Sequence, residues 1–183
     1  MEKGYKLRIA DGINAEEMRI TIDEAMMHFP ELKDIIIEFR YKKMNATMMA
    51  TITTGSVFKC KRKRTYLVYY NHQGGKKIGI KLHDVPSEAR VGILAHELVH
   101  IADYTQRSIF NLLGLAIAYL FPSSRRSYER KTDMGTIEHG FGKQLLAYTE
   151  FIDSSPLAPQ AYRDYLKKFY LNSEEIKESI SKF

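Results

Sequence analysis

The chain has 183 residues, of which 44% are hydrophobic and 27% charged, a balance that suits one globular domain spanning residues 1–183 with its own core. Its single cysteine, Cys60, excludes an internal disulfide framework and favours a reducing compartment such as the cytoplasm. The net charge of +6 permits an acidic partner or surface without demonstrating one.

The N-terminal region predicts a short strand followed by a helix. Residues 1–14 are polar and lack the apolar core of a secretory signal, in keeping with a cytoplasmic protein. The strand is expected at Tyr5–Ala10. Asn14 can cap a helix whose apolar residues recur at helical spacing as far as Phe29, and Pro30 ends it.

After residue 34 the hydrophobic period changes from helical to extended. Runs of β-branched and aromatic residues predict strands at Ile35–Tyr41, Asn45–Thr54, Val57–Cys60, Arg64–Asn71 and Lys77–Leu82. The turn Gln73-Gly74-Gly75 would join the last two strands as a hairpin. We therefore expect a small, mostly antiparallel sheet of three to five strands.

The strongest charge run is Lys59–Arg64, which holds five cations around Cys60. Such a run could contact phosphates. No helix-turn-helix or RNA-binding signature accompanies it, so a solvated loop or sheet edge is the preferred interpretation. Nucleic acid is therefore not expected as a partner.

The motif that dominates the sequence is H-E-x-x-H, inside a helix predicted from Ser87 to about Gln106. Residues four apart share a helix face, so His96 and His100 can direct both imidazoles at one metal ion. Two neutral imidazoles suit zinc, and Glu97 is adjacent to take a proton from water activated by the metal. The alternative is a pair of hydrogen-bonded core histidines, which would be costly to bury without partners.

The expected third ligand is Glu129. Glu129 and Asp133 are four residues apart on a later helix, predicted over residues 126–151, so Asp133 could hydrogen-bond the far nitrogen of a ligand histidine. Asp103 is a rival ligand on the same face as His96 and His100. On an unbroken helix it lies roughly 7 to 8 Å along the axis from their midpoint, so we expect it to orient a ligand or join two helices instead.

H-E-x-x-H followed by E-x-x-x-D resembles the gluzincin metallopeptidases, the broad thermolysin-like clan, over residues 34–152. Its E-x-x-T-D form is similar to the E-x-x-A-D of membrane-associated H-E-x-x-H peptidases. The resemblance implies an α+β fold in which a small sheet packs on the catalytic helix and a second, glutamate-bearing helix, with extra terminal helices. It implies zinc bound by His96, His100 and Glu129, with Glu97 as general base and Asp133 behind a ligand.

Residues 109–121 are apolar apart from Asn111 and Gly114. They are too few to span a bilayer comfortably, which takes about 20 apolar residues. We expect either a buried helix or a segment that lies on a membrane surface or a partner. In the resembled membrane peptidases this interval holds membrane segments, which keeps a peripheral membrane contact open.

His139 is a candidate catalytic residue, ten positions beyond Glu129. If the second motif helix bends at Gly135, His139 could stabilise an oxyanion, and Tyr104 and Tyr128 are weaker candidates for that role. A hydrogen-bonded core or surface histidine is the alternative. Two closing helices are predicted at the C-terminus, over 159–170 and 173–182.

Together these features predict a zinc metallopeptidase whose substrate is a peptide or protein. The sheet edge could hold an extended peptide by strand addition. A zinc-binding scaffold or regulatory protein that cleaves nothing is the alternative.

Overall fold

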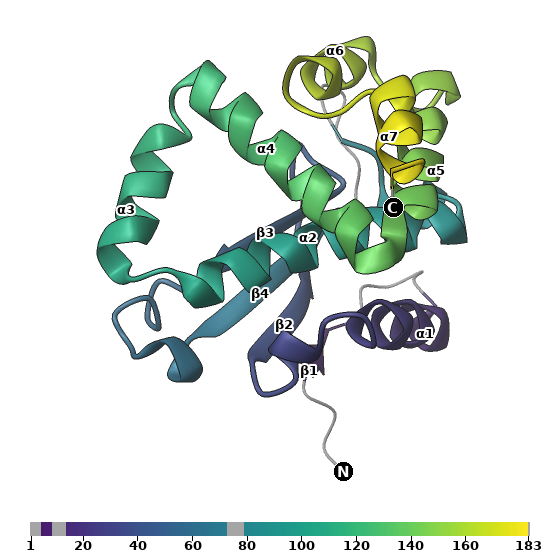
Figure 1. Ribbon diagram of the computed structural model, residues 1–183. Helices are drawn as coiled ribbons and strands as arrows, with labels where there is room; N and C mark the ends of the chain where they lie inside the picture. Colours follow the sequence, from purple (N-terminus) through teal and green to yellow (C-terminus); the bar gives the residue numbers. More distant parts are fainter. Residues whose placement is uncertain (1–4, 9–13, 73–78, 183) are drawn as a thin grey trace.

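A computed structural model describes residues 5–8, 14–72 and 79–182 (Figure 1). The strands are β1 (Tyr5–Leu7), β2 (Ile36–Tyr41), β3 (Met48–Ile52) and β4 (Thr65–Tyr70). The helices are α1 (Ala15–Met26), α2 (Ser87–Gln106), α3 (Ile109–Ala118), α4 (Pro122–Thr136), α5 (Gly142–Ser154), α6 (Gln160–Phe169) and α7 (Ser173–Ile180). The predicted α+β class, with extra helices at both ends, is confirmed.

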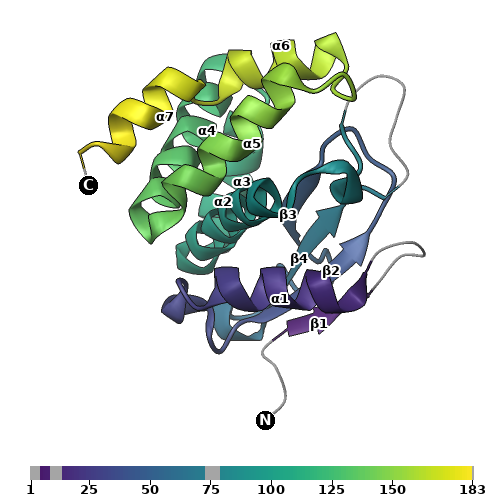
Figure 2. The same cartoon turned by 90° about the vertical axis from the view of Figure 1, so that its right-hand side faces the viewer.

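Helix α2 lies at the centre of the molecule. Strand β3 and helices α1, α4 and α5 all pack against it. The C-terminal helices gather on one side of α2 and the sheet lies on the other (Figure 2). Its core-facing side chains, such as Leu94, Leu98 and Ile101, are fully buried. Because neighbours surround it, α2 can hold polar groups away from water.

The sheet is mixed, in the order β1-β2-β4-β3. β1 pairs with β2 and β2 with β4 in parallel, whereas β3 pairs with β4 antiparallel. The prediction of a mostly antiparallel sheet is therefore wrong. The reason is the connections: α1 crosses over between β1 and β2, as parallel neighbours require. The chain then reverses at β3 and again at β4, which returns β4 to the direction of β2.

Two predicted strands are not formed where the structure describes them. Residues 57–60 form no strand and lead into a short 3-10 turn, Lys61–Lys63. Residues 79–81 are also outside the sheet, while 73–78, with the predicted hairpin turn, lie outside the described residues. Within the described part of the chain, β3 is therefore a sheet edge.

The second motif helix is interrupted. It was predicted to run to residue 151, but α4 ends at Thr136 and a π-helical segment, Ile137–Phe141, precedes α5. Gly140 has φ 89°, a conformation that glycine adopts at little cost. Gly135, in contrast, serves close packing: a Cβ there would lie 2.9 Å from Val99 Cγ1 of α2.

Residues 109–121, here called the α3 arm, project from the body of the molecule (Figure 1). None of the ten residues of α3 is buried, so the predicted buried helix is wrong. The arm is joined to the core at its two ends, by α2 and α4. Among the described residues, no helix combines the length and the apolar character needed to cross a membrane.

Candidate metal centre

Three buried side chains from α2 and α4 converge. The ligand atoms of His96, His100 and Glu129 all lie within 4.8 Å of one another. The Nε2 atoms of His96 and His100 are each 3.3 Å from Glu129 Oε2. The i, i+4 spacing on α2 brings the two imidazoles together, and the close packing of α4 on α2 brings the carboxylate to them.

The polar atoms of this cluster fit a metal ion. Glu129 Oε2 is buried and has no hydrogen-bond partner in the described part of the chain, although two imidazole nitrogens lie nearby. Leaving a buried carboxylate oxygen without a partner is costly, and a cation shared by the three side chains would remove that cost. Two histidines and one glutamate are a donor set typical of catalytic zinc.

Asp133 orients the first histidine. His96 Nδ1 is 2.9 Å from Asp133 Oδ1, and Asp133 Oδ2 accepts a hydrogen bond from the Leu171 backbone N–H at 2.8 Å. Burial lowers the pKa of His96, but the Asp133 and Glu129 carboxylates outweigh it and raise that pKa well above its usual value. With Nδ1 engaged, Nε2 is the nitrogen available to a metal.

Thr132 plays the matching part for the second histidine. Its hydroxyl donates to the Tyr128 carbonyl at 3.0 Å, and its Oγ1 lies 3.4 Å from His100 Nδ1. His100 can therefore donate from Nδ1 and present Nε2 to the cluster. Thr132 was not among the predicted site residues, although its position three residues after Glu129 places it on the same helix face.

Glu97 lies between α2 and the sheet edge. It is 5% exposed, and its Oε2 accepts a hydrogen bond from the Ala50 backbone N–H of β3 at 2.5 Å. Burial raises the pKa of Glu97, while the two ligand histidines act to lower it. A carboxylate with a raised pKa, beside the cluster, suits a group that must accept and return a proton.

A tyrosine of the α3 arm also reaches the cluster. The Tyr119 hydroxyl donates to Glu129 Oε1, the carboxylate oxygen that does not face the histidines. Burial, and next the Glu129 charge, raise the pKa of Tyr119, so it remains a neutral donor. No spacing in the sequence connects Tyr119 to the two motifs, because the contact depends on how the arm folds back.

Asp103 is outside the cluster. Its carboxylate accepts from the Arg107 guanidinium at 2.5 and 3.1 Å, and from the Tyr128 hydroxyl at 2.8 Å. It therefore links α2 to α4, which agrees with the expected helix-joining role and not with the rival ligand role. Burial raises the pKa values of Tyr104 and Tyr128, which keeps both hydroxyls protonated.

The structure does not bring His139 to the cluster. Its Nδ1 lies 2.7 Å from the Gly135 carbonyl, its Nε2 lies 3.1 Å from Glu31, and its ring stacks on Phe29. Helix α4 continues through Gly135 without a bend, and His139 lies about 80° around the helix from Glu129, so its ring faces Phe29 and Glu31 instead of the cluster. The oxyanion role predicted for His139 is therefore not carried further.

An open cleft of about 430 Å³ leads to the cluster. Glu97, His100 and Glu129 lie in its wall. Strand β3 forms one side, and the inner face of α3, including Leu112 and Leu115, forms the other. The centre is thus buried in the protein but reachable by a ligand that lies along β3.

We compared the chain with models of protein families, with curated proteins and with solved structures, and none of the three comparisons found a match.

Proposed function

We propose that the chain is a zinc-dependent metallopeptidase. The observation that supports this is the convergence of His96, His100 and Glu129, with Glu97 beside them and a cleft open to solvent. A zinc ion held by those three side chains would supply Lewis acidity to a water molecule and to the scissile carbonyl.

Glu97 would perform the proton transfers. Its carboxylate takes a proton from the attacking water, whose oxygen forms the new bond to the carbonyl carbon. When the C–N bond breaks, the same carboxylate returns the proton to the departing amine. The raised pKa of Glu97, caused by burial, favours a group that holds this proton transiently.

Strand β3 offers a place for an extended substrate. The Thr53 N–H and the Thr47 carbonyl bond to β4, so by the alternation of an antiparallel pair the backbone groups of Met48, Ala50 and Ile52 point outward. The Ala50 N–H meets Glu97, which places this row of backbone groups beside the cluster. A peptide added along this edge would bring its carbonyl groups toward the metal centre.

The test combines metal content with hydrolysis. We expect the purified protein to retain about one zinc per chain and to cleave a quenched-fluorescence peptide library. Glu97→Gln should retain zinc and lose about 10²–10⁴-fold in cleavage, the range for a missing general base. Glu88→Gln, an exposed glutamate on the same helix, is the matched control and should leave both unchanged.

Undiminished cleavage by Glu97→Gln would contradict the proposed mechanism. The alternative is a zinc-binding scaffold that cleaves nothing. Retained zinc in a wild-type protein that cleaves no member of the library would favour it. The open cleft argues for the peptidase, since a scaffold has no need to leave its centre accessible.

A further inference from the structure

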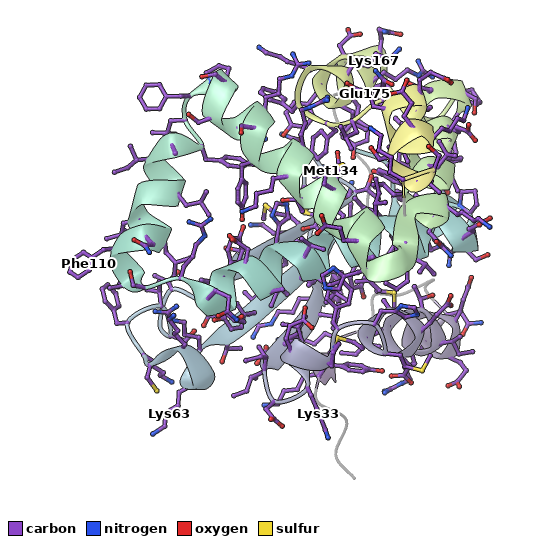
Figure 3. All side chains as sticks on the ribbon, in the orientation of Figure 1. Lys33, Lys63, Phe110, Met134, Lys167 and Glu175 are labelled. Atoms are coloured by element: carbon purple, nitrogen blue, oxygen red, sulfur yellow. The ribbon has the colours of Figure 1, made fainter. Side chains whose placement is uncertain are left out.

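The outer face of the α3 arm is apolar and uncovered. Phe110, Ile117, Leu120 and Phe121 expose 80, 61, 79 and 58% of their surface, respectively, and Leu113, which also borders the cleft, exposes 55%. The labelled Phe110 side chain extends away from the body of the molecule (Figure 3). Five large apolar side chains, close in sequence and exposed to this degree, form a surface that water does not favour.

The arm is apolar on its inner face as well. Residues 109–121 contain no charged side chain, and Leu112 and Leu115 line the cleft. A helix that is apolar all round belongs in a protein core or in lipid. The inner face has the cleft beside it, whereas the outer face has no covering element among the described residues.

Cations lie beside one end of this apolar surface, in the loop at 57–64. A loop packs where α2 passes into the arm, because Lys61 donates to the Gln106 carbonyl at 2.5 Å and Arg64 to the Arg107 carbonyl at 2.9 Å. The loop exposes Lys59, Lys63 and also Phe58, which is 81% exposed. Lys63 and Phe110 lie on the same side of the molecule (Figure 3).

The charges of the chain are strongly segregated. Residues 39–83 hold eleven lysines and arginines and no acidic residue, and residues 104–128 hold three arginines and no acidic residue. These two segments supply the arm, its neighbouring loop and strand β3. Of these cations, Lys59 and Lys63 are exposed in the loop that packs where α2 passes into the arm.

We propose that the α3 arm and the loop at 57–64 dock on an anionic lipid bilayer. The helix would lie in the plane of the interface with Phe110 and Ile117 among the acyl chains and the lysines at the headgroups. A lipid surface fits better than a protein, because the large apolar side chains project from the body of the molecule, the arm carries no charge, and lysines are exposed beside it.

Docking would hold the cleft about one helix diameter, roughly 10 Å, from the bilayer, since α3 separates the two. For the proposed peptidase, substrates would then be extended segments close to the membrane. That consequence rests on the proposed function, whereas the docking itself does not.

The experiment is cosedimentation of the full chain with vesicles of phosphatidylcholine alone or with 30% phosphatidylserine. We expect binding to the anionic vesicles, weaker binding to the neutral ones, and loss of binding at high salt. Phe110→Ser combined with Ile117→Ser should weaken binding at least tenfold. Ile20→Ser with Met27→Ser, two side chains 58 and 75% exposed elsewhere, should leave it unchanged.

Two further variants separate the contributions. Lys59→Gln with Lys63→Gln should reduce the preference for anionic vesicles, and Glu97→Gln should bind as the wild type whether or not the protein is a peptidase. Binding that is absent, or equal in the Phe110/Ile117 variant, would overturn the proposal. A wild-type dimer in light scattering that the same variant turns into a monomer would also overturn it, in favour of a second copy of the chain.

Discussion

Helices α2 and α3 follow one another in the chain and are both rich in apolar residues, yet their environments are opposite. In α2, Leu94 and Leu98 are fully buried, and His96 and Glu97 are almost fully buried. In α3 no residue is buried, and Phe110 is 80% exposed. One helix buries polar groups and the other exposes apolar ones.

Hydrophobicity alone therefore does not determine which helix enters the core. Helix α2 is surrounded by β3, α1, α4 and α5, while α3 is joined to the rest only at its ends and faces the cleft. Each helix breaks the local rule that its environment should match its side chains, and such breaks concentrate at functional sites. In α2 the break coincides with the proposed metal centre, and in α3 with the proposed docking surface.

The largest expected effect comes from changing the acidic side chains that contact the buried polar groups of α2. Glu129→Gln removes a charged ligand and should lower zinc affinity by more than the 10–100-fold typical of a residue that only orients a ligand. Asp133→Asn should fall within about 10–100-fold, because its single amide oxygen can keep only one of the two hydrogen bonds that Asp133 accepts, from His96 or from the Leu171 N–H. Competition with a chromogenic chelator measures both. Equal losses in the two variants would mean that Glu129 does not bind the metal.

A matched pair of leucines, one in each region, tests the difference in burial between α2 and the α3 arm. Leu94 of α2 is fully buried, and Leu120 of the arm is 79% exposed. Leu94→Ala should lower the free energy of unfolding by about 2–5 kcal/mol, because it leaves a cavity. Leu120→Ala should change it by less than about 0.5 kcal/mol, as expected for a surface position.

Urea unfolding with a chelator present measures this pair without a contribution from metal. A similar loss in both variants would show that the arm packs into the core in solution.

The smallest expected effect concerns the contact behind the centre, between α4 and α7. The Arg130 guanidinium, one residue after Glu129, pairs with Glu175 at 2.6 and 3.0 Å and lowers the pKa of that carboxyl to about 2. A lowered pKa contributes stability that is present above the ordinary value of Glu175 and is lost as the pH falls through about 2.

Glu175→Gln should therefore lower stability at pH 7 by less than about 1 kcal/mol, because the pair is partly exposed to solvent. The difference from the wild type should shrink as the pH falls from about 4 toward 2. Urea unfolding at several pH values measures it. A difference that grows on acidification would contradict the assigned pKa.

Much of the local structure was predictable from the sequence. The helical range 87–106 and the cap at Asn14 follow from spacing and capping chemistry, and both are confirmed. The i, i+4 spacings also placed the polar groups on common faces. The structure accordingly brings His96, His100 and Glu129 together, with Asp133 behind the first.

The sequence by itself thus determined where the helices lie in the chain and which face of each carries its polar residues. Both follow from periodicity along one segment. Only the tertiary structure decided which segments meet. The contact of Thr132 with His100, the reach of Tyr119 to Glu129 and the parallel direction of β4 all depend on how elements pack. The position of His139 also depends on contacts with a distant segment, its stacking on Phe29 and its pairing with Glu31. Contacts between distant segments arise from chain reversal and close packing, which no pattern within one segment specifies.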